Sequence, residues 1–256
     1  MSRRVADGAR TALVTGASSG IGAATVRALA AAGFDTVAAA RRIERCEALA
    51  REVGGRALRL DVADPGSVAA LAVEIPEVDV VVHSAGGALG LEPLAEADEE
   101  RWLAMYESNV IGIARVTKAL LPALRAGRDP QIVIIGSVAG VEVYEGGGGY
   151  TAAKHGANAI ARTLRLELLT DGIRVTEVAP GLVDTEFSLV RFDGDAERAA
   201  EVYRGIEPLT ADDVADLIAF VVTRPGHVTI DYASIKPRAQ ASATVVNRRD
   251  RPAEPS

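Results

Sequence analysis

Three polar residues have the types and the spacing of an acid–base site. Tyr150 and Lys154 are four residues apart in a helical pattern, which places both side chains on one face of the helix. A free phenol, with a pKa of about 10, is a poor base near neutral pH, but an adjacent ammonium favours the phenolate and lowers that pKa. Ser137 lies 13 residues before Tyr150, directly after an expected strand and Gly136. Its hydroxyl could donate a hydrogen bond to an oxygen on which negative charge develops.

A Tyr-x-x-x-Lys pair alone is more often a surface pair, so this interpretation depends on a second motif near the N-terminus. Residues 15–22 read TGASSGIG, between an expected strand over residues 11–15 and an expected helix over residues 21–32. The spacing of Gly16, Gly20 and Gly22 differs from the usual G-x-G-x-x-G pattern, but the physics is shared. Backbone without Cβ atoms can approach a pyrophosphate, and the helix N-terminus offers free N–H groups. The strand–turn–helix context favours this phosphate site over a purely structural turn.

Two arginines predict which dinucleotide binds. In NAD sites, an acidic residue about 20 residues past the glycine turn usually binds the ribose 2′-hydroxyl, whereas arginine suits the 2′-phosphate of NADP. The second expected strand, over residues 36–40, ends in Ala40, and Arg41 and Arg42 follow it. The alternative is a pair of solvated arginines at the start of a helix. We predict NADP(H) as the cofactor.

The elements that must position these residues alternate along the chain. Short apolar runs at residues 57–60, 78–82, 131–135 and 174–178 predict further strands, and helical patterns lie between them, one over residues 109–125 and a long one after Tyr150. Strands that are apolar on both faces and joined by helices indicate an α/β fold, with a parallel sheet covered on both sides. The segment over residues 184–208 departs from this alternation, as expected of an excursion over a binding crevice.

The chain shows no Pro/Gly/Ser-rich linker, which predicts a single domain over residues 1–247. The last nine residues, 248–256, read RRDRPAEPS and lack apolar content to bury, so we expect a disordered tail.

Composition disfavours several classes of partner and site. The 256 residues are 48% hydrophobic and carry a formal charge of −7, so the chain has no overall attraction to nucleic acid or to an anionic membrane. No apolar run approaches the ~18 residues of a membrane span or the ~7–15 of a secretory signal, which predicts a cytoplasmic protein. The one cysteine, Cys46, cannot form an internal disulfide and is expected to be a half-buried helix residue. We predict no metal site.

Taken together, the motifs resemble the short-chain dehydrogenase/reductase family. The likeness spans roughly residues 10–237 and is carried by TGASSGIG at 15–22, Asp61-Val62, Ser84-Ala85-Gly86, Asn109, Ser137, Tyr150 with Lys154, and Pro180-Gly181 with Thr185. The resemblance implies a single Rossmann-type, doubly wound parallel sheet of about seven strands with helices on both faces. It also implies an NADP-dependent enzyme that acts on CH–OH groups, and a homo-oligomer, either a tetramer or a dimer.

The resemblance also implies a role for each site residue. Tyr150 is the general acid/base, Lys154 holds the nicotinamide ribose, and Asn109 anchors a water that relays protons to Lys154. An exposed helix asparagine is the alternative for Asn109. The residues expected to bind the cofactor are Gly16, Ser18, Ser19, Gly20, Ile21, Gly22, Arg41, Arg42, Asp61, Val62, Ser84, Ala85, Gly86, Tyr150, Lys154, Pro180, Gly181, Val183 and Thr185.

One position departs from the family pattern, which usually reads Asn-Ala-Gly where this chain has Ser84-Ala85-Gly86. Serine lacks the two-ended amide, so we expect slightly weaker cofactor binding rather than loss of activity. The preceding His83 is expected to be a packed or capping residue rather than a catalytic one.

Four further segments resemble the NADP-dependent 3-hydroxy acid dehydrogenases, which include serine and allo-threonine dehydrogenases. They read GGALGLEP at 86–93, PGLVDTEFSLVRFDGD at 180–195, LTADDV at 209–214 and PGHVTI at 225–230. This likeness implies a small 3-hydroxy acid substrate, or its semialdehyde or keto form. The alternatives are an NADPH-dependent aldehyde or ketone reductase of secondary metabolism and, less favoured, a non-catalytic NADP(H)-binding sensor. Such sensors typically lose the tyrosine or lysine that this chain keeps.

A carboxylate substrate needs a local cation. Arg191 is the leading candidate, ahead of Arg238 and Lys236. We expect the rest of the substrate pocket to contain Val143, Tyr144 and Phe187, with a mobile edge at the four glycines over residues 146–149.

Overall fold

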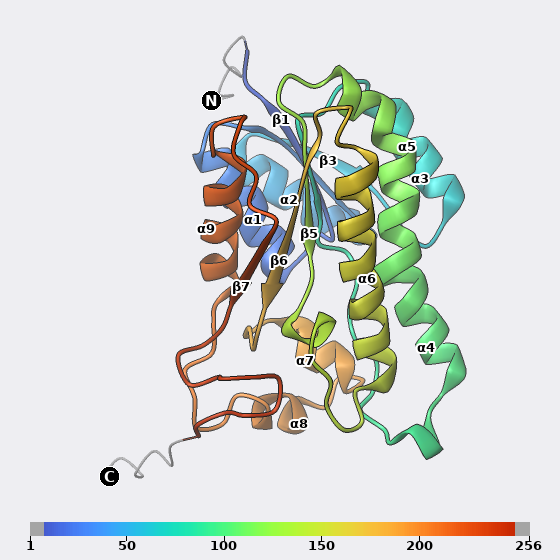
Figure 1. Cartoon of the computed structure of the whole chain (residues 1–256), viewed down its shortest axis with the longest axis vertical. Coiled ribbons are helices and arrows are strands. Elements are labelled where there is room, and N and C mark those ends of the chain that lie inside the picture. Colours follow the sequence, from blue (N-terminus) through green and yellow to red (C-terminus); the bar gives the residue numbers. More distant parts are fainter. Residues whose placement is uncertain (1–7, 249–256) are drawn as a thin grey trace.

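A seven-stranded parallel sheet forms the centre of the computed structural model, which describes residues 8–248. The strand order is β3-β2-β1-β4-β5-β6-β7, and every neighbouring pair is parallel (Figure 1). The strands are β1 (Thr11–Thr15), β2 (Asp35–Ala40), β3 (Arg56–Arg59), β4 (Val80–His83), β5 (Gln131–Ile135), β6 (Arg174–Pro180) and β7 (Tyr232–Ile235). This confirms the expected doubly wound, Rossmann-type sheet.

Helices cover both faces of this sheet. In Figure 1, α1 and α9 lie on one side and α5 and α6 on the other, while α7 and α8 lie beyond one end of the strands. The helices are α1 (Gly20–Ala31), α2 (Ile43–Val53), α3 (Pro65–Glu74), α4 (Glu99–Tyr106), α5 (Gly112–Ala126), α6 (Gly148–Glu167), α7 (Glu186–Arg191), α8 (Ala196–Glu201) and α9 (Ala211–Val222). Short 3₁₀ turns span Leu94–Glu96 and Val138–Gly140, and a π-helical segment spans Glu107–Ile111.

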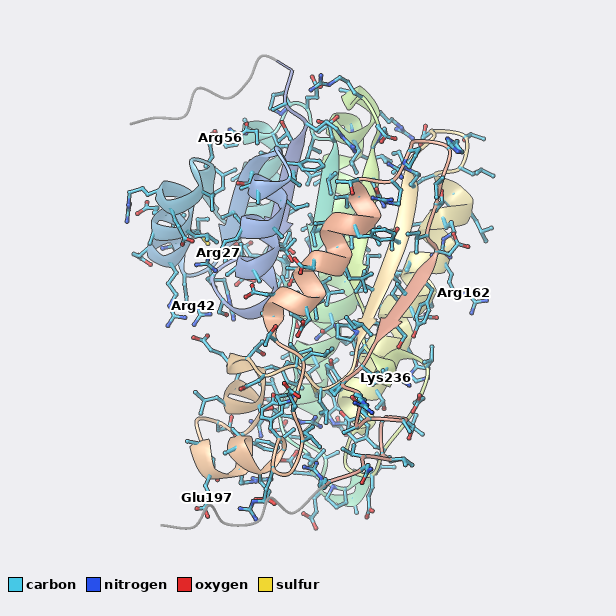
Figure 2. All side chains as sticks on the ribbon, turned by 90° about the vertical axis from the view of Figure 1, so that its left-hand side faces the viewer. Arg27, Arg42, Arg56, Arg162, Glu197 and Lys236 are labelled. Atoms are coloured by element: carbon cyan, nitrogen blue, oxygen red, sulfur yellow. The ribbon has the colours of Figure 1, made fainter. Side chains whose placement is uncertain are left out.

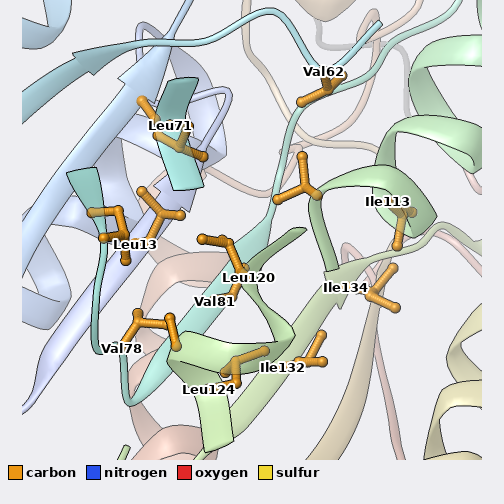
Figure 3. Close-up of a cluster of buried hydrophobic side chains, with 14 of the residues drawn as sticks. Leu13, Val62, Leu71, Val78, Val81, Ile113, Leu120, Leu124, Ile132 and Ile134 are labelled. Atoms are coloured by element: carbon orange, nitrogen blue, oxygen red, sulfur yellow. The ribbon is translucent and has the colours of Figure 1, made fainter. Parts of the chain in front are cut away.

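Two apolar clusters hold the three layers together, and alternation along β1 shows how. Leu13 points into the cluster beneath α3, α5 and α6, whereas Ala12 and Val14 point into the cluster beneath α1, α2 and α9. Figure 3 shows part of the first cluster, where Leu120 of α5 lies among Val81 and other strand residues. Cys46 is fully buried in the second cluster rather than half-buried.

The helix expected over residues 109–125 begins earlier than its apolar pattern indicates. Asp98 caps the start of α4, where its Oδ1 accepts hydrogen bonds from the backbone N–H groups of Glu100 and Arg101. Helical backbone then continues through the π-helical segment and α5 to Ala126. A π turn holds more residues than an α turn, so side-chain positions after it are rotated relative to those before it.

Two other segments have different outcomes. Residues 184–208 form the expected excursion beyond the ends of the strands, where they carry the short helices α7 and α8. Arg248, expected to begin a disordered tail, donates hydrogen bonds to the carbonyl oxygens of Val202 and Arg204. The rest of that tail, residues 249–256, lies outside the described residues. None of the helices within residues 8–248 has the length and apolar character that a bilayer crossing requires.

We expect Leu120→Ala to lower the free energy of unfolding by about 2–5 kcal/mol, because Leu120 is fully buried and its truncation leaves a cavity between α5 and the sheet. Denaturant unfolding of the purified protein measures the loss. Val73→Ala on α3 removes a side chain that is 82% exposed and is expected to change stability by less than about 0.5 kcal/mol. A Leu120 variant as stable as the Val73 variant would contradict this view of the core.

Candidate active site

A cleft of about 860 Å³ opens at the carboxyl ends of the strands and contains most of the residues singled out in the sequence. All of the expected cofactor residues line it, together with Ser137, Phe187 and Arg191. Asn109, Val143 and Tyr144 do not line it. The cleft lies where parallel α/β sheets bind ligands, because helix N-termini and loop residues converge beyond the strand ends.

The glycine-rich turn forms one wall of the cleft and leaves a helix N-terminus free. Gly16 has φ +67° and Gly20 has φ +51°, left-handed conformations that favour glycine. Ser19 precedes α1 without capping it through its side chain, and no acidic residue occupies the first turn. The first N–H groups of α1 therefore have no side-chain acceptor at Ser19 and lie at the positive end of the helix dipole, which suits a phosphate.

Arg42 reaches this turn from the end of β2. Its Nε and Nη2 donate hydrogen bonds of 3.1 and 2.7 Å to the hydroxyls of Ser18 and Ser19. Its Nη1 donates to the Glu186 carboxylate at 2.9 Å. Arg41 is exposed and lines the same part of the cleft. In Figure 2, Arg42 lies on the side of the α1 and α2 layer that faces α7 and α8.

The ends of β3 and β4 form the opposite part of the cleft. The Asp61 carboxylate accepts a hydrogen bond from the Ala63 N–H, and the Asp61 N–H donates to the Ser67 hydroxyl. Thr15 Oγ1 accepts hydrogen bonds of 3.1 Å from the N–H groups of both Ser84 and Ala85. Ser84, at the position where asparagine is usual, therefore bonds to β1 through its backbone N–H. Serine and asparagine provide this N–H equally well.

These features fit NADP(H). The N-terminus of α1 and the Ser18 and Ser19 hydroxyls can meet a pyrophosphate, and Arg41 and Arg42 supply cations for a 2′-phosphate. The cleft extends from these arginines to Tyr150 and Lys154, as a dinucleotide requires.

Tyr150 lies near the start of α6 and is almost fully buried at the inner end of the cleft. Its ring meets that of Phe187 edge to face, with centroids 5.5 Å apart. Burial raises the pKa of the phenol well above its usual value, and a hydrogen bond with Ser137 and the charge of Arg191 act in the opposite direction. We expected Lys154 to lower this pKa, but in the structure the lowering comes from Ser137 and Arg191 and does not overcome burial.

Lys154 is buried one turn further along α6. Its ammonium donates a 2.9 Å hydrogen bond to the carbonyl oxygen of Ile135 at the end of β5, and it lies 5.8 Å from the centroid of the Tyr150 ring. Burial lowers the pKa of Lys154 to about 8, with the charge of Glu177 opposing that shift.

Ser137 follows β5 and caps the short 3₁₀ turn over residues 138–140. Its Oγ accepts a hydrogen bond from the Ala139 N–H at 3.1 Å, which holds the hydroxyl at the cleft beside Tyr150. The backbone N–H uses only an acceptor site of Oγ, so the hydroxyl hydrogen can be donated, either to Tyr150 or to the oxygen of a bound ligand.

Asn109 lies behind the cleft within the π-helical segment. It is 1% exposed, so its interpretation as an exposed helix asparagine is wrong. Its Nδ2 donates to the carbonyl oxygens of Met105 and Gly87, and its buried Oδ1 has no protein partner within the described residues. An unpaired buried acceptor suits a water ligand. Its role in a proton relay stays a prediction.

The end of β6 and the loop after it line the cleft with Pro180, Gly181 and Thr185. The Gly181 N–H donates to the carbonyl oxygen of Ile235, and Gln240 Oε1 accepts from the Leu182 N–H at 2.9 Å. Thr185 caps α7, and an added Cβ at Gly20 would lie 3.3 Å from its methyl carbon. The loop is therefore fixed against both β7 and the glycine-rich turn.

Two of the four expected substrate residues line the cleft. Arg191 Nε donates to the carbonyl oxygen of Gly90 at 2.9 Å, and its buried Nη2 has no protein partner within the described residues. The Arg191 guanidinium lies 5.4 Å from the ring centroid of Tyr144.

Val143 is 69% exposed and outside the cleft, so the prediction that Val143 lines the cleft is wrong. Lys236 is tied to the Ala241 carbonyl oxygen and lies beside β7 (Figure 2).

The glycines over residues 146–149 have a packing role. Gly148 and Gly149 lie in the first turn of α6, and a Cβ at Gly149 would come within 2.6 Å of both Met105 and Trp102. Small residues here let α6 approach α4 closely, which brings Tyr150 to the cleft.

Two acidic residues near the site were missed in the sequence. Glu177 is a buried carboxylate within β6, and its only sequence signal is a charge in an apolar strand. Glu186 pairs with Arg42 across 144 residues of chain, a contact with no local signal.

Comparison with known proteins places these features in context. The sequence pattern described as short chain dehydrogenase matches residues 10–194. An oxidoreductase of Mycobacterium tuberculosis without an assigned substrate is 57% identical over 92% of this chain and 94% of its own. An NADP-dependent 3-hydroxy acid dehydrogenase of Schizosaccharomyces pombe is 38% identical over 94% and 97%. A sulfoacetaldehyde reductase of Chromohalobacter salexigens is 40% identical over 89% and 94%. The closed form of a serine dehydrogenase complexed with NADP+ superposes with a TM-score of 0.87 at 35% identity, over 94% and 100%.

His83, directly before Ser84, provides a pH-dependent test of the strand that borders the cleft. It is buried, and its Nε2 lies 3.0 Å from the Thr117 hydroxyl, as expected of a packed histidine. Burial lowers the pKa of His83 from 6.5 to about 4, so the folded state favours the neutral ring.

Between pH 6.5 and 4, the unfolded chain binds more protons at His83 than the folded chain does, so this stability contribution is present above pH 6.5 and is lost as the pH falls. We expect His83→Asn to lose about 2 kcal/mol less stability than the wild type between pH 7 and pH 5, measured by urea unfolding. The exposed His227→Asn is the control. Equal pH dependence in the wild type and the His83 variant would contradict the assignment.

Proposed function

Because the chain belongs to the short-chain dehydrogenase/reductase family and is an oxidoreductase that acts on alcohol and carbonyl groups with NADP(H), we propose that its substrate is a small 3-hydroxy acid, or the semialdehyde or keto form of one. The observation that carries this proposal is Arg191, a cation in the cleft beside Tyr150 whose buried Nη2 has no partner among residues 8–248.

The residues of the chain have distinct tasks in the proposed mechanism. NADP(H), when bound, supplies or accepts the hydride that carries the electron pair. In the reductive direction, Tyr150 donates its phenolic proton to the carbonyl oxygen as the C=O π bond opens, and in the oxidative direction it takes that proton back. Ser137 donates a hydrogen bond to the same oxygen, where negative charge develops. Burial keeps the phenol protonated, as proton donation requires.

Lys154 and Asn109 support this proton transfer from behind. The Lys154 ammonium, with a pKa of about 8, is near the point of exchanging a proton at physiological pH. We propose that Lys154 also holds the nicotinamide ribose and that Asn109 Oδ1 holds a water connected to Lys154. The unpartnered Oδ1 supports that assignment.

An organic anion is the substrate feature that Arg191 would recognise. Its Nε is already used by the Gly90 carbonyl oxygen, which fixes the plane of the guanidinium and leaves Nη2 for a ligand. A carboxylate can accept from such a group in a charge-assisted hydrogen bond, and so can a sulfonate. The name of the sulfoacetaldehyde reductase makes a small sulfonated aldehyde the second candidate.

The expected assembly and location belong to the same proposal. We propose a homo-oligomer, a dimer or tetramer. Exposed apolar side chains on α4 and α6, among them Leu103 and Leu166, support an interface between subunits at these helices. A cytoplasmic location agrees with a single, buried cysteine, which needs no oxidising compartment.

We expect NADP+ reduction, followed by nicotinamide absorbance, with serine, allo-threonine, 3-hydroxybutyrate or 3-hydroxypropionate, and little turnover of simple neutral alcohols. Tyr150→Phe removes the group that takes the substrate proton in this direction and is expected to lower kcat at least ~100-fold while NADP+ still binds. Turnover of neutral or bulky compounds alone would overturn the 3-hydroxy acid proposal and favour the reductase of secondary metabolism. Tight NADPH binding without turnover of any carbonyl would favour the sensor.

Arg191→Gln tests recognition of the anion. The amide can still donate to the Gly90 carbonyl oxygen but carries no charge, so we expect KM for acidic substrates to rise roughly 10- to 100-fold. The kcat/KM for neutral analogues should change less than about threefold. Arg198→Gln, outside the cleft on α8, is the matched control. Equal losses for acidic and neutral substrates would assign Arg191 a structural role instead.

A further inference from the structure

The Glu186 carboxylate joins α7 to two arginines that follow β2, Arg42 and Arg45. Glu186 accepts hydrogen bonds from two guanidiniums, 2.9 Å from Arg42 Nη1 to Oε2 and 2.7 Å from Arg45 Nη1 to Oε1. Arg42 is also bound to the Ser18 and Ser19 hydroxyls of the glycine-rich turn. The ion pair therefore lies at the part of the cleft where a 2′-phosphate would lie.

The neighbours of Glu186 connect this pair to the rest of the site. Thr185, which precedes it, packs against Gly20 of the glycine-rich turn. Phe187, which follows it, packs edge to face on Tyr150. Residues 185–187, at the start of α7, therefore contact the glycine-rich turn, the two arginines and Tyr150.

Glu186 is an anion next to a site for another anion. Hydrogen bonds from Arg45 and Arg42 hold the pKa of its carboxyl below its usual range, so it is charged at neutral pH. A 2′-phosphate carries up to two negative charges and prefers the same guanidinium N–H groups. Each group would weaken the hold of the other on Arg42 through competition for donors and through like-charge repulsion.

We propose that Glu186 is a specificity-determining residue that competes with the 2′-phosphate of NADP(H) for Arg42 and Arg45. The competition lowers the preference for NADP(H) over NAD(H) below the value that the arginines alone would give. It also couples phosphate binding to the position of α7, because binding of the phosphate weakens the contact that holds the first turn of α7 against the arginines. NAD(H) leaves that contact intact.

Glu186→Gln tests this by equilibrium binding at low ionic strength, with NADP+, NAD+, 2′,5′-ADP and 5′-AMP as ligands in calorimetric titrations. The variant keeps the size of the side chain and removes its charge. We expect NADP+ and 2′,5′-ADP to bind roughly three- to tenfold more tightly, while the affinities for NAD+ and 5′-AMP change less than about twofold. An affinity change of this size is on the order of what exposed ion pairs contribute, and Glu186 makes two of them. The gain should shrink as salt screens the charges.

Glu52→Gln is the matched control, because Glu52 makes a similar two-point pair with Arg27 and does not line the cleft. A gain of less than twofold for NADP+ in Glu186→Gln, or an equal gain for NAD+, would overturn the proposal. So would weaker NADP+ binding, which would make Glu186 a residue that orients Arg42.

The inference rests on Arg42 as a contact of the 2′-phosphate and not on the identity of the substrate. The Arg42→Ala variant tests this premise separately from the competition, since it should weaken NADP+ binding at least ~10-fold relative to NAD+ binding. If Arg42→Ala affects both cofactors equally, the premise and the inference fail together. If only NADP+ is weakened but Glu186→Gln has no effect, the arginine assignment stands and the competition is refuted.

Discussion

The contact between the glycine-rich turn and the end of β4 is the constraint on which the rest of the cleft depends. A Cβ at Gly16 would lie 2.6 Å from the carbonyl oxygen of Ser84, so only glycine lets the two backbones meet there. The Thr15 hydroxyl adds to this contact, because it accepts hydrogen bonds from the two backbone N–H groups that directly follow β4. Because no side chain intervenes, the N-terminus of α1 and the ends of β4 and β5 face one cavity. Phosphates and reacting groups can therefore be held on a single rigid frame.

Burial decides the character of the proton-transfer groups at the other end of that cavity. Tyr150 and Lys154 are both buried, which favours the neutral form of each. Glu177 lies within β6, where it acts on Lys154 through its charge and accepts a hydrogen bond from Asn158. The phenol is thereby kept as an acid, and the ammonium is poised near neutrality. A charge brought into the cleft by a cofactor would then shift the pKa values of both groups, because both are buried.

The segment after β6 connects functions that the sheet keeps apart. Its first residues are fixed by β7 and Gln240, and α7 then contacts the glycine-rich turn, the arginines and Tyr150. Arg191 at the end of α7 exchanges backbone and side-chain hydrogen bonds with Gly90 from the loop after β4. The substrate end of the cleft is therefore formed between two loops, whereas the cofactor end is formed by the sheet and α1.

The sequence by itself determined the features that depend on local spacing. Short apolar runs predicted β1 to β6, and the glycine turn, Ser137, Tyr150 and Lys154 were expected at one site and line one cleft. Local patterns could not show that Asn109 is buried, that Val143 faces away from the cleft, or that the glycines before Tyr150 pack on Trp102. Nor could they show that Glu186 holds Arg42, or that burial outweighs charge at Tyr150. Those properties depend on contacts and desolvation between segments far apart in the chain, which only tertiary packing decides.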